Sequence, residues 1–490
     1  MTPSALLIKA GHLFASDRPL EVADVLVEQG RIVQVGPDLQ APHARVVDAR
    51  GRIVMPGLVN AHTHSNQALE KGLCDRYPLD AWMLIASYGG SNAELSPREL
   101  YVSAMIGAIE MVRSGSTAVL DMPRVPLADF EASADAIMQA YADIGMRAGV
   151  AIAYTDVNFP GSLPLHLIPG LAEKLKPART APVEDLLPRL AAFVDRWKGR
   201  HPRLQPMLGP SSLPRCSTEL FEASVDLARR LDVGLHTHLL SAKSQVFVGQ
   251  QRYGGSTVQF LDRIGALNER TTFAHSIWLD DDEVSRMAAS PAVVVYNPVS
   301  NMKLGAGRAP VPQLARAGAR LALGSDGASS ADAQNMFETI KGAAVSHRAY
   351  HPEEEWIQAG QALAMCWHGG AAALREPIGR IAPGCHADFT LLHTRSLFLA
   401  PWEQLAGQIV HSELGGSVES VIIGGELVLD HGRFTRVDEA ALHAEAQEIV
   451  NRLYAGLPER MARFEKMRPD FRNLESAVQA TRLHFSRACC

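Results

Sequence analysis

Long apolar runs and a strong charge of one sign are both missing from this 490-residue sequence. No stretch of 18 apolar residues occurs, so no membrane-spanning helix is expected. The net charge of −6 gives no general attraction for nucleic acid or anionic membranes. The chain starts without a basic segment followed by a long apolar one. We therefore expect a cytoplasmic protein that binds neither nucleic acid nor a membrane.

Cysteine is scarce as well. The sequence has six cysteines, and no two of them have Cys-x-x-C spacing. Such a small number in a long chain gives no disulfide framework, and we interpret these residues as buried or incidental thiols. The remaining composition is 47% hydrophobic and 20% charged, which is typical of a globular enzyme with a substantial buried core.

Eight short apolar segments alternate with stretches of helical spacing, and this alternation predicts an α/β fold. A closed (β/α)₈ TIM barrel is the architecture expected for eight such repeats, with its active site at the carboxyl ends of the strands. The predicted strands are residues 52–59, 117–121, 147–154, 204–208, 234–239, 271–276, 292–298 and 320–327.

The two ends of the chain read as strands and turns outside the barrel. Neither end has enough sheet to bury a face alone, so we expect one small β-sandwich formed by both. The predicted division is residues 1–55 plus 375–436 for the sandwich and 56–374 for the barrel. Residues 437–490 are expected to form a charged helical extension that carries no chemistry.

Metal-binding side chains stand at the exits of four predicted strands. His62 and His64 end the first strand, and side chains two apart on a strand share a face. His238, His275 and Asp326 follow the fifth, sixth and eighth strands. Imidazoles with one carboxylate suit a divalent ion such as Zn²⁺, with an open position for a water molecule. Asp326 is the natural base for the proton of that water.

Residues near these exits are candidates for substrate contacts, although each could equally be a packing residue. The loop after the first strand, residues 65–88, is too long for a simple connection and is expected to cover the pocket. Asn66, Gln67 and Trp82 lie in that loop, Ser211 follows the fourth strand, and Asn301 follows the seventh.

Residues 56–64, 274–275, 297–305 and 323–328 together resemble the amidohydrolase superfamily. The most similar branch holds the S-adenosylhomocysteine and methylthioadenosine deaminases, the cytosine and guanine deaminases and the triazine hydrolases. The resemblance implies a homo-oligomer with one Zn²⁺ or Fe²⁺ per subunit, bound by His62, His64, His238 and Asp326. It also implies that His275 orients the water molecule or steadies the developing charge.

The sequence departs from that branch at the residue that shuttles the proton. The deaminases have a glutamate three residues after the fifth-strand histidine, where this chain has Ser241. An alcohol is too weak a general acid at neutral pH unless it relays a proton from a neighbour, and Lys243, His236 and His275 are the nearby candidates. Ala81 stands where relatives carry the acidic residue that holds a ribose, which argues against a nucleoside substrate. Asp80 either begins a helix or, in a different loop register, reaches the pocket.

The sequence therefore predicts a mononuclear metal-dependent hydrolase that displaces an amine from an sp² carbon of a small nitrogen-containing heterocycle. Hydrolysis of an amide, urea or carbamate, or dechlorination of a triazine, is the alternative within the same chemistry. The missing glutamate leaves a third possibility of a different class, a paralogue that binds metal but has lost turnover.

Overall fold

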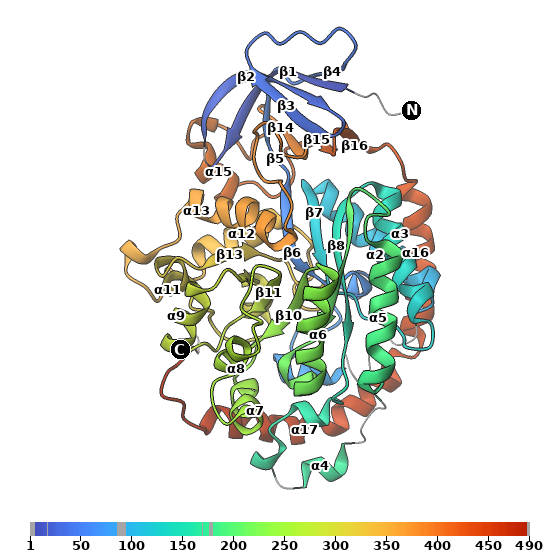
Figure 1. Ribbon diagram of the computed structural model, residues 1–490, viewed down its shortest axis with the longest axis vertical. Helices are drawn as coiled ribbons and strands as arrows, with labels where there is room; N and C mark the ends of the chain where they lie inside the picture. Colours follow the sequence, from blue (N-terminus) through green and yellow to red (C-terminus); the bar gives the residue numbers. More distant parts are fainter. Residues whose placement is uncertain (1–4, 17, 86–94, 169, 176–179, 488–490) are drawn as a thin grey trace.

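The computed structural model describes residues 5–16, 18–85, 95–168, 170–175 and 180–487. Within these residues, eight parallel strands form a barrel in sequence order, surrounded by helices (Figure 1). A hydrogen bond from Asp326 N to His62 O, 2.9 Å long, joins the exit of the last strand to the first. The predicted (β/α)₈ barrel is confirmed. Its strands are β6 (Leu58–Thr63), β7 (Ser116–Asp121), β8 (Arg147–Tyr154), β9 (Leu204–Pro210), β10 (Leu235–Leu239), β11 (Thr271–His275), β12 (Val293–Tyr296) and β13 (Arg320–Leu323).

Two predicted strands have different limits in the structure. The segment predicted as one strand at residues 52–59 is divided at Gly57, because β5 (Arg52–Pro56) pairs in the other sheet and β6 begins the barrel. A Cβ on Gly57 would lie 2.1 Å from the Thr117 side chain, so only glycine fits this passage. The eighth strand ends at Leu323 rather than Gly327, and Asp326 lies beyond it with a φ of 67°.

Strands from both ends of the chain form a second, nine-stranded sheet in the described residues, as predicted. It runs in the order β17-β16-β15-β14-β5-β1-β2-β3, with β4 beside β1. Apolar side chains of β2 and β3 share one core with those of β15 and β16, so the two halves of this sheet face each other. The further strands are β1 (Ala5–Ala15), β2 (Arg18–Glu28), β3 (Arg31–Gly36), β4 (Arg45–Asp48), β14 (Phe389–His393), β15 (Val418–Ile423), β16 (Glu426–Asp430) and β17 (Arg433–Phe434).

Helices follow the barrel strands and shield them. Ser96 caps the helix at residues 97–113 through a capping box with Glu99, and Asp280 and Glu283 do the same at residues 281–289. The helices are α1 (Leu79–Leu84), α2 (Pro97–Arg113), α3 (Phe130–Ile144), α4 (Leu171–Lys174), α5 (Val183–Trp197), α6 (Thr218–Leu231), α7 (Lys243–Tyr253), α8 (Thr257–Arg263), α9 (Asp281–Ala289), α10 (Pro298–Lys303), α11 (Val311–Arg316), α12 (Met336–Val345), α13 (Ala359–Ala364), α14 (Gly370–Leu374), α15 (Leu405–His411), α16 (Glu439–Ala455) and α17 (Leu457–Ala480).

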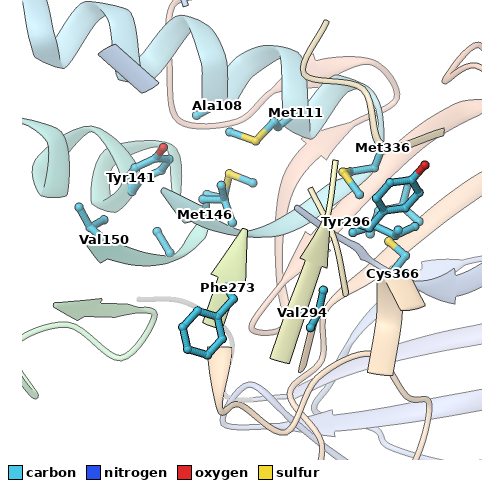
Figure 2. Packing of buried hydrophobic residues seen from close by; sticks show 14 of the residues in the cluster. Ala108, Met111, Tyr141, Met146, Val150, Phe273, Val294, Tyr296, Met336 and Cys366 are labelled. Carbon is cyan, nitrogen blue, oxygen red and sulfur yellow. The ribbon is translucent and has the colours of Figure 1, made fainter. Parts of the chain in front are cut away.

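The main core lies between the barrel strands and these helices. Figure 2 shows Phe273 and Val294 on neighbouring strands β11 and β12, with Met111 of α2 and Met336 at the start of α12 in the same cluster. All four side chains are at most 1% exposed. This packing fixes the strands from outside, so their carboxyl ends are held in place for a site.

The orientation of the barrel follows from the passage through Gly57. Since β5 lies in the terminal sheet and β6 leads away from it, the amino ends of the barrel strands face that sheet. The carboxyl ends therefore point to the opposite end of the molecule, where α17 lies (Figure 1). Among the described residues, no helix combines the length and apolar character needed to cross a membrane.

Candidate metal centre

Three imidazoles and one carboxylate converge at the carboxyl ends of β6, β10 and β13. Asp326 Oδ1 lies 3.5 Å from His62 Nε2 and 3.3 Å from His64 Nε2. His64 Nε2 lies 3.3 Å from His238 Nε2. His62, His64 and His238 form one group whose ligand atoms lie within 4.8 Å of one another, and His62, His275 and Asp326 form a second. The four residues that the sequence singled out as ligands are thus brought together around His62.

Backbone carbonyls orient two of these rings. His64 Nδ1 donates to Met122 O at 2.7 Å, and His238 Nδ1 donates to Ser211 O at 2.5 Å. A neutral imidazole with its proton on Nδ1 has its lone pair on Nε2. Both lone pairs therefore point at the same place. Ser211, expected to contact a substrate, holds His238 in position through its main chain.

His62 has a histidine behind it. His62 Nδ1 lies 2.7 Å from His236 Nε2, and His236 Nδ1 lies 2.6 Å from Thr272 Oγ1. Both imidazoles are fully buried. The sequence indicates His236 as a possible proton donor, and the structure places it as the partner of His62. Its spacing is the signal for this positioning role, because His236 and His238 repeat the alternation of His62 and His64.

Asp326 is fixed by two donors. Ser300 Oγ donates to its Oδ2 at 2.5 Å, and Gly327 N donates to its Oδ1 at 2.6 Å. Burial alone would raise the pKa of Asp326, but the neighbouring imidazoles of His62 and His64 lower it well below its ordinary value. The side chain is therefore a carboxylate at neutral pH. Ser300 had no distinguishing signal in the sequence beyond its neighbour Asn301.

His275 lies beside the cluster, and Asn301 orients it. His275 Nδ1 donates to Asn301 Oδ1 at 2.8 Å, and His275 Nε2 lies 3.9 Å from Asp326 Oδ2. Its Nε2 is then free to accept a proton from a group placed between the two residues. Asn301, predicted to bind substrate, contacts the catalytic candidate His275, and its Nδ2 is buried without a hydrogen-bond partner.

Burial keeps two of the predicted ligands uncharged. It lowers the pKa of His62 to about 4 and, together with the neighbouring imidazoles, lowers the pKa of His238 well below its ordinary value. His62 Nε2 is buried and has no hydrogen-bond partner in the structure. A buried polar atom without a partner is costly, and a metal ion at this point would satisfy it. The donor set therefore fits a divalent ion such as Zn²⁺.

The polar residues of the first loop bind other loops of the protein. Asn66 Oδ1 accepts a hydrogen bond from Arg124 N at 3.0 Å, and Gln67 Oε1 accepts one from Ser329 Oγ at 2.8 Å. Trp82 is buried in an apolar cluster that includes side chains of α17. Tyr88, at the end of the predicted loop, lies outside the described residues.

Ser241 and Lys243 differ in the contacts of their side chains. Ser241 is 4% exposed, its Oγ has no hydrogen-bond partner, and its N donates to Gln245 Oε1 at 2.9 Å. Lys243 Nζ donates to Gln479 O of α17 at 2.9 Å and lies 6.0 Å from the centre of the Trp278 ring. The lysine ammonium is thus tied to the C-terminal helix.

The sequence matches the Amidohydrolase family over residues 53–428, and the chain belongs to that family. A 5-methylthioadenosine/S-adenosylhomocysteine deaminase of Nitratidesulfovibrio vulgaris is 33% identical over 455 residues, covering 91% of this chain and 97% of the relative. A 5'-deoxyadenosine deaminase of Methanothermobacter thermautotrophicus is 32% identical, covering 85% of this chain and 91% of the relative. The resemblance inferred from the sequence motifs is confirmed.

Solved structures of similar proteins share the fold over most of this chain. An adenosine deaminase from Xanthomonas campestris with bound zinc has a TM-score of 0.82 and 28% identity, covering 92% of this chain and 98% of that one. An atrazine chlorohydrolase from Arthrobacter aurescens TC1, complexed with zinc, also has a TM-score of 0.82. It is 24% identical, covers 91% of this chain and 100% of its own, and supports the fold alone.

Proposed function

We propose that this chain is a metal-dependent aminohydrolase that replaces an amino group on an sp² carbon of a small nitrogen heterocycle with oxygen from water. The observation that carries the proposal is the convergence of His62, His64, His238 and Asp326, with lone pairs already directed at one point. The relatives named as deaminases of adenosine derivatives support the reaction type.

The mechanism assigns His62, His64, His238 and Asp326 to one Zn²⁺ or Fe²⁺ ion per subunit. Such an ion, when bound, lowers the pKa of a water molecule toward neutrality and so provides a nucleophile. The Asp326 carboxylate would accept a proton from the attacking water, and Ser300 and Gly327 keep the carboxylate in place. His275 Nε2, oriented by Asn301 and 3.9 Å from Asp326 Oδ2, would take up this proton from Asp326 and pass it to the leaving amine.

Ser241 is the main departure from the deaminase pattern. Its hydroxyl is too weak an acid to protonate the leaving amino group of the substrate at neutral pH. We assign it instead to the substrate side of the pocket, because its Oγ is buried and unpartnered, a costly arrangement unless a ligand satisfies it. Hydrolysis of an amide, urea or carbamate, or dechlorination of a triazine, is the second candidate, because a better leaving group needs less help from an acid.

A substrate screen with site variants tests the proposal. Zinc-loaded protein is assayed for ammonia release from purine nucleosides, free bases, pyrimidines and aminotriazines. A ureide and a chlorotriazine are included for the second candidate. The expected result is ammonia from an amino heterocycle and none from His64→Ala or Asp326→Asn, with both variants still folded by circular dichroism. Turnover retained in either variant would remove the assigned site, and no turnover of any compound by the zinc-loaded chain would favour the lapsed paralogue.

The Ser241→Glu variant distinguishes an active enzyme from a metal-binding paralogue that has lost turnover. If Ser241 makes room for the native substrate, the variant should lose the activity that the wild-type chain shows. A strong gain of deaminase activity from an inactive wild-type chain would indicate an enzyme that has lost its acid. A cytoplasmic location, a homo-oligomeric state and the division into residues 1–55 with 375–436, 56–374 and 437–490 remain our proposals.

A further inference from the structure

The C-terminal residues 457–487 lie across the carboxyl ends of the barrel strands. Helix α17 contacts α1, the short 3₁₀ helix at Leu165–Leu167 and α7, which follow β6, β8 and β10. The chain then continues to Arg487, whose O accepts from Arg308 N at 2.7 Å after β12 and whose Nε donates to Leu279 O at 3.0 Å after β11. One segment therefore touches the loops that follow five of the eight strands.

The inner side of α17 is apolar and sealed. Phe471, Leu474 and Val478 are at most 2% exposed, and they share one cluster with Trp82 of the loop after β6 and Phe159 of the loop after β8. The rings of Phe159 and Phe471 are parallel, with centroids 6.2 Å apart. Such a buried contact does not open without exposing apolar surface to water.

Polar contacts hold both edges of the same helix. Tyr77 Oη donates to Glu465 at 2.8 Å, and Lys174 Nζ donates to Asp470 at 2.8 Å. Lys243, two residues after Ser241, reaches Gln479 O from the β10 side. The helix is thus fixed to three different loops of the rim, and the family match, which ends at residue 428, does not include it.

We propose that residues 457–487 form the outer wall of the substrate cavity and limit the size of the molecule that reaches the metal centre. This inference rests on the proposed function, because the wall matters only if the centre below it binds a metal and a substrate. It assigns Trp82 and Lys243 to the wall, where they position α17. It also means that a compound with a bulky substituent pointing out of the barrel is excluded until α17 is displaced.

Zinc removal by chelators of two sizes tests the wall without knowledge of the substrate. Zinc-loaded full-length protein is mixed with excess EDTA or with the smaller pyridine-2,6-dicarboxylate, and zinc release is followed with a chromogenic indicator. The wild-type chain should lose zinc more slowly to EDTA. Phe471→Ala removes the central contact of the wall and should speed release to EDTA at least about tenfold, with a smaller effect on the small chelator.

Leu442→Ala is the matched control, because this buried leucine lies near the start of α16, outside residues 457–487. It should leave the ratio of the two rates as in the wild-type chain. Lys243→Met removes one anchor of α17, leaves the apolar cluster intact and replaces Phe471→Ala if that variant fails to fold. It should lower the ratio of the release rate to the small chelator over the release rate to EDTA a few-fold. Equal ratios in wild-type, Phe471→Ala and Lys243→Met would overturn the wall alone. A chain that takes up no zinc would contradict the proposed function and the wall with it.

Discussion

The buried histidine behind the first ligand shows how single residues prepare the site. If His62 offers Nε2 to a metal, its proton lies on Nδ1 and is donated to His236 Nε2 at 2.7 Å. His236 in turn donates from Nδ1 to Thr272 Oγ1 at 2.6 Å, so one tautomer is specified along the whole row. Such outer partners fix the orientation of a metal-binding ring.

His236→Phe should therefore weaken zinc binding about 10- to 100-fold. The variant keeps an aromatic ring of similar shape but removes the acceptor for His62. Zinc affinity is measured by competition with a chelating indicator, which needs no substrate. Thr272→Val is the milder companion, since it leaves His236 in place and should have a smaller effect. An unchanged zinc affinity in His236→Phe would show that His62 needs no partner.

At the scale of elements, the barrel closes where β13 meets β6, and a glycine makes this possible. A Cβ on Gly324 would lie 2.5 Å from Asn297 Oδ1 and 2.6 Å from the Cβ of His62. The exit of β13 therefore touches the ligand-bearing end of β6 directly. No side chain fits between the two elements.

Gly324→Ala should lower the free energy of unfolding by about 1–3 kcal/mol, because the added methyl group overpacks a closed contact. It should also weaken zinc binding, since it pushes His62 away from Asp326. Urea denaturation and zinc competition measure the two effects. Gly360→Ala in α13, where a Cβ has nothing within 4 Å, is the control and should be neutral or slightly stabilising. Equal stability of both variants would contradict the close contact.

Some elements could be predicted from the sequence and others could not. The strands and the ligands at their ends follow from local spacing, because alternation along a strand decides which side chains face the barrel. The division at Gly57 was missed, because the apolar run continues through it while the backbone passes from one sheet to another. The placement of α17 was also missed, since packing against distant loops leaves no local signal in a charged helix.

At the scale of the whole molecule, a fully buried ion pair joins the barrel to the terminal sheet. Arg147 of β8 donates to Asp388, just before β14, through Nε at 2.8 Å and Nη2 at 3.2 Å. Both side chains are at most 2% exposed. Although burial alone would raise the pKa of Asp388, the guanidinium of Arg147 lowers it below 3.8.

Arg147→Met should lower the free energy of unfolding by about 3–5 kcal/mol, because it leaves the buried Asp388 carboxylate without its partner. The folded-state pKa of Asp388 is lowered, so the stabilisation is fully present above 3.8 and is lost as the pH falls through the folded-state value. Urea denaturation at pH 7 and at decreasing pH should thus show the difference between wild type and variant shrink in acid. Arg286→Ala, which breaks exposed pairs with Asp282 and Asp262, should change the free energy of unfolding very little. Equal costs would argue against a role of the buried pair.

The zinc content of the purified chain, measured by mass spectrometry after zinc loading and removal of loose metal, tests the account most directly. We predict one ion per chain for the wild type and almost none for Asp326→Asn or His64→Ala, with all three proteins folded. A folded wild-type chain that retains no zinc, or variants that retain as much as the wild type, would contradict the metal centre on which the proposed reaction depends.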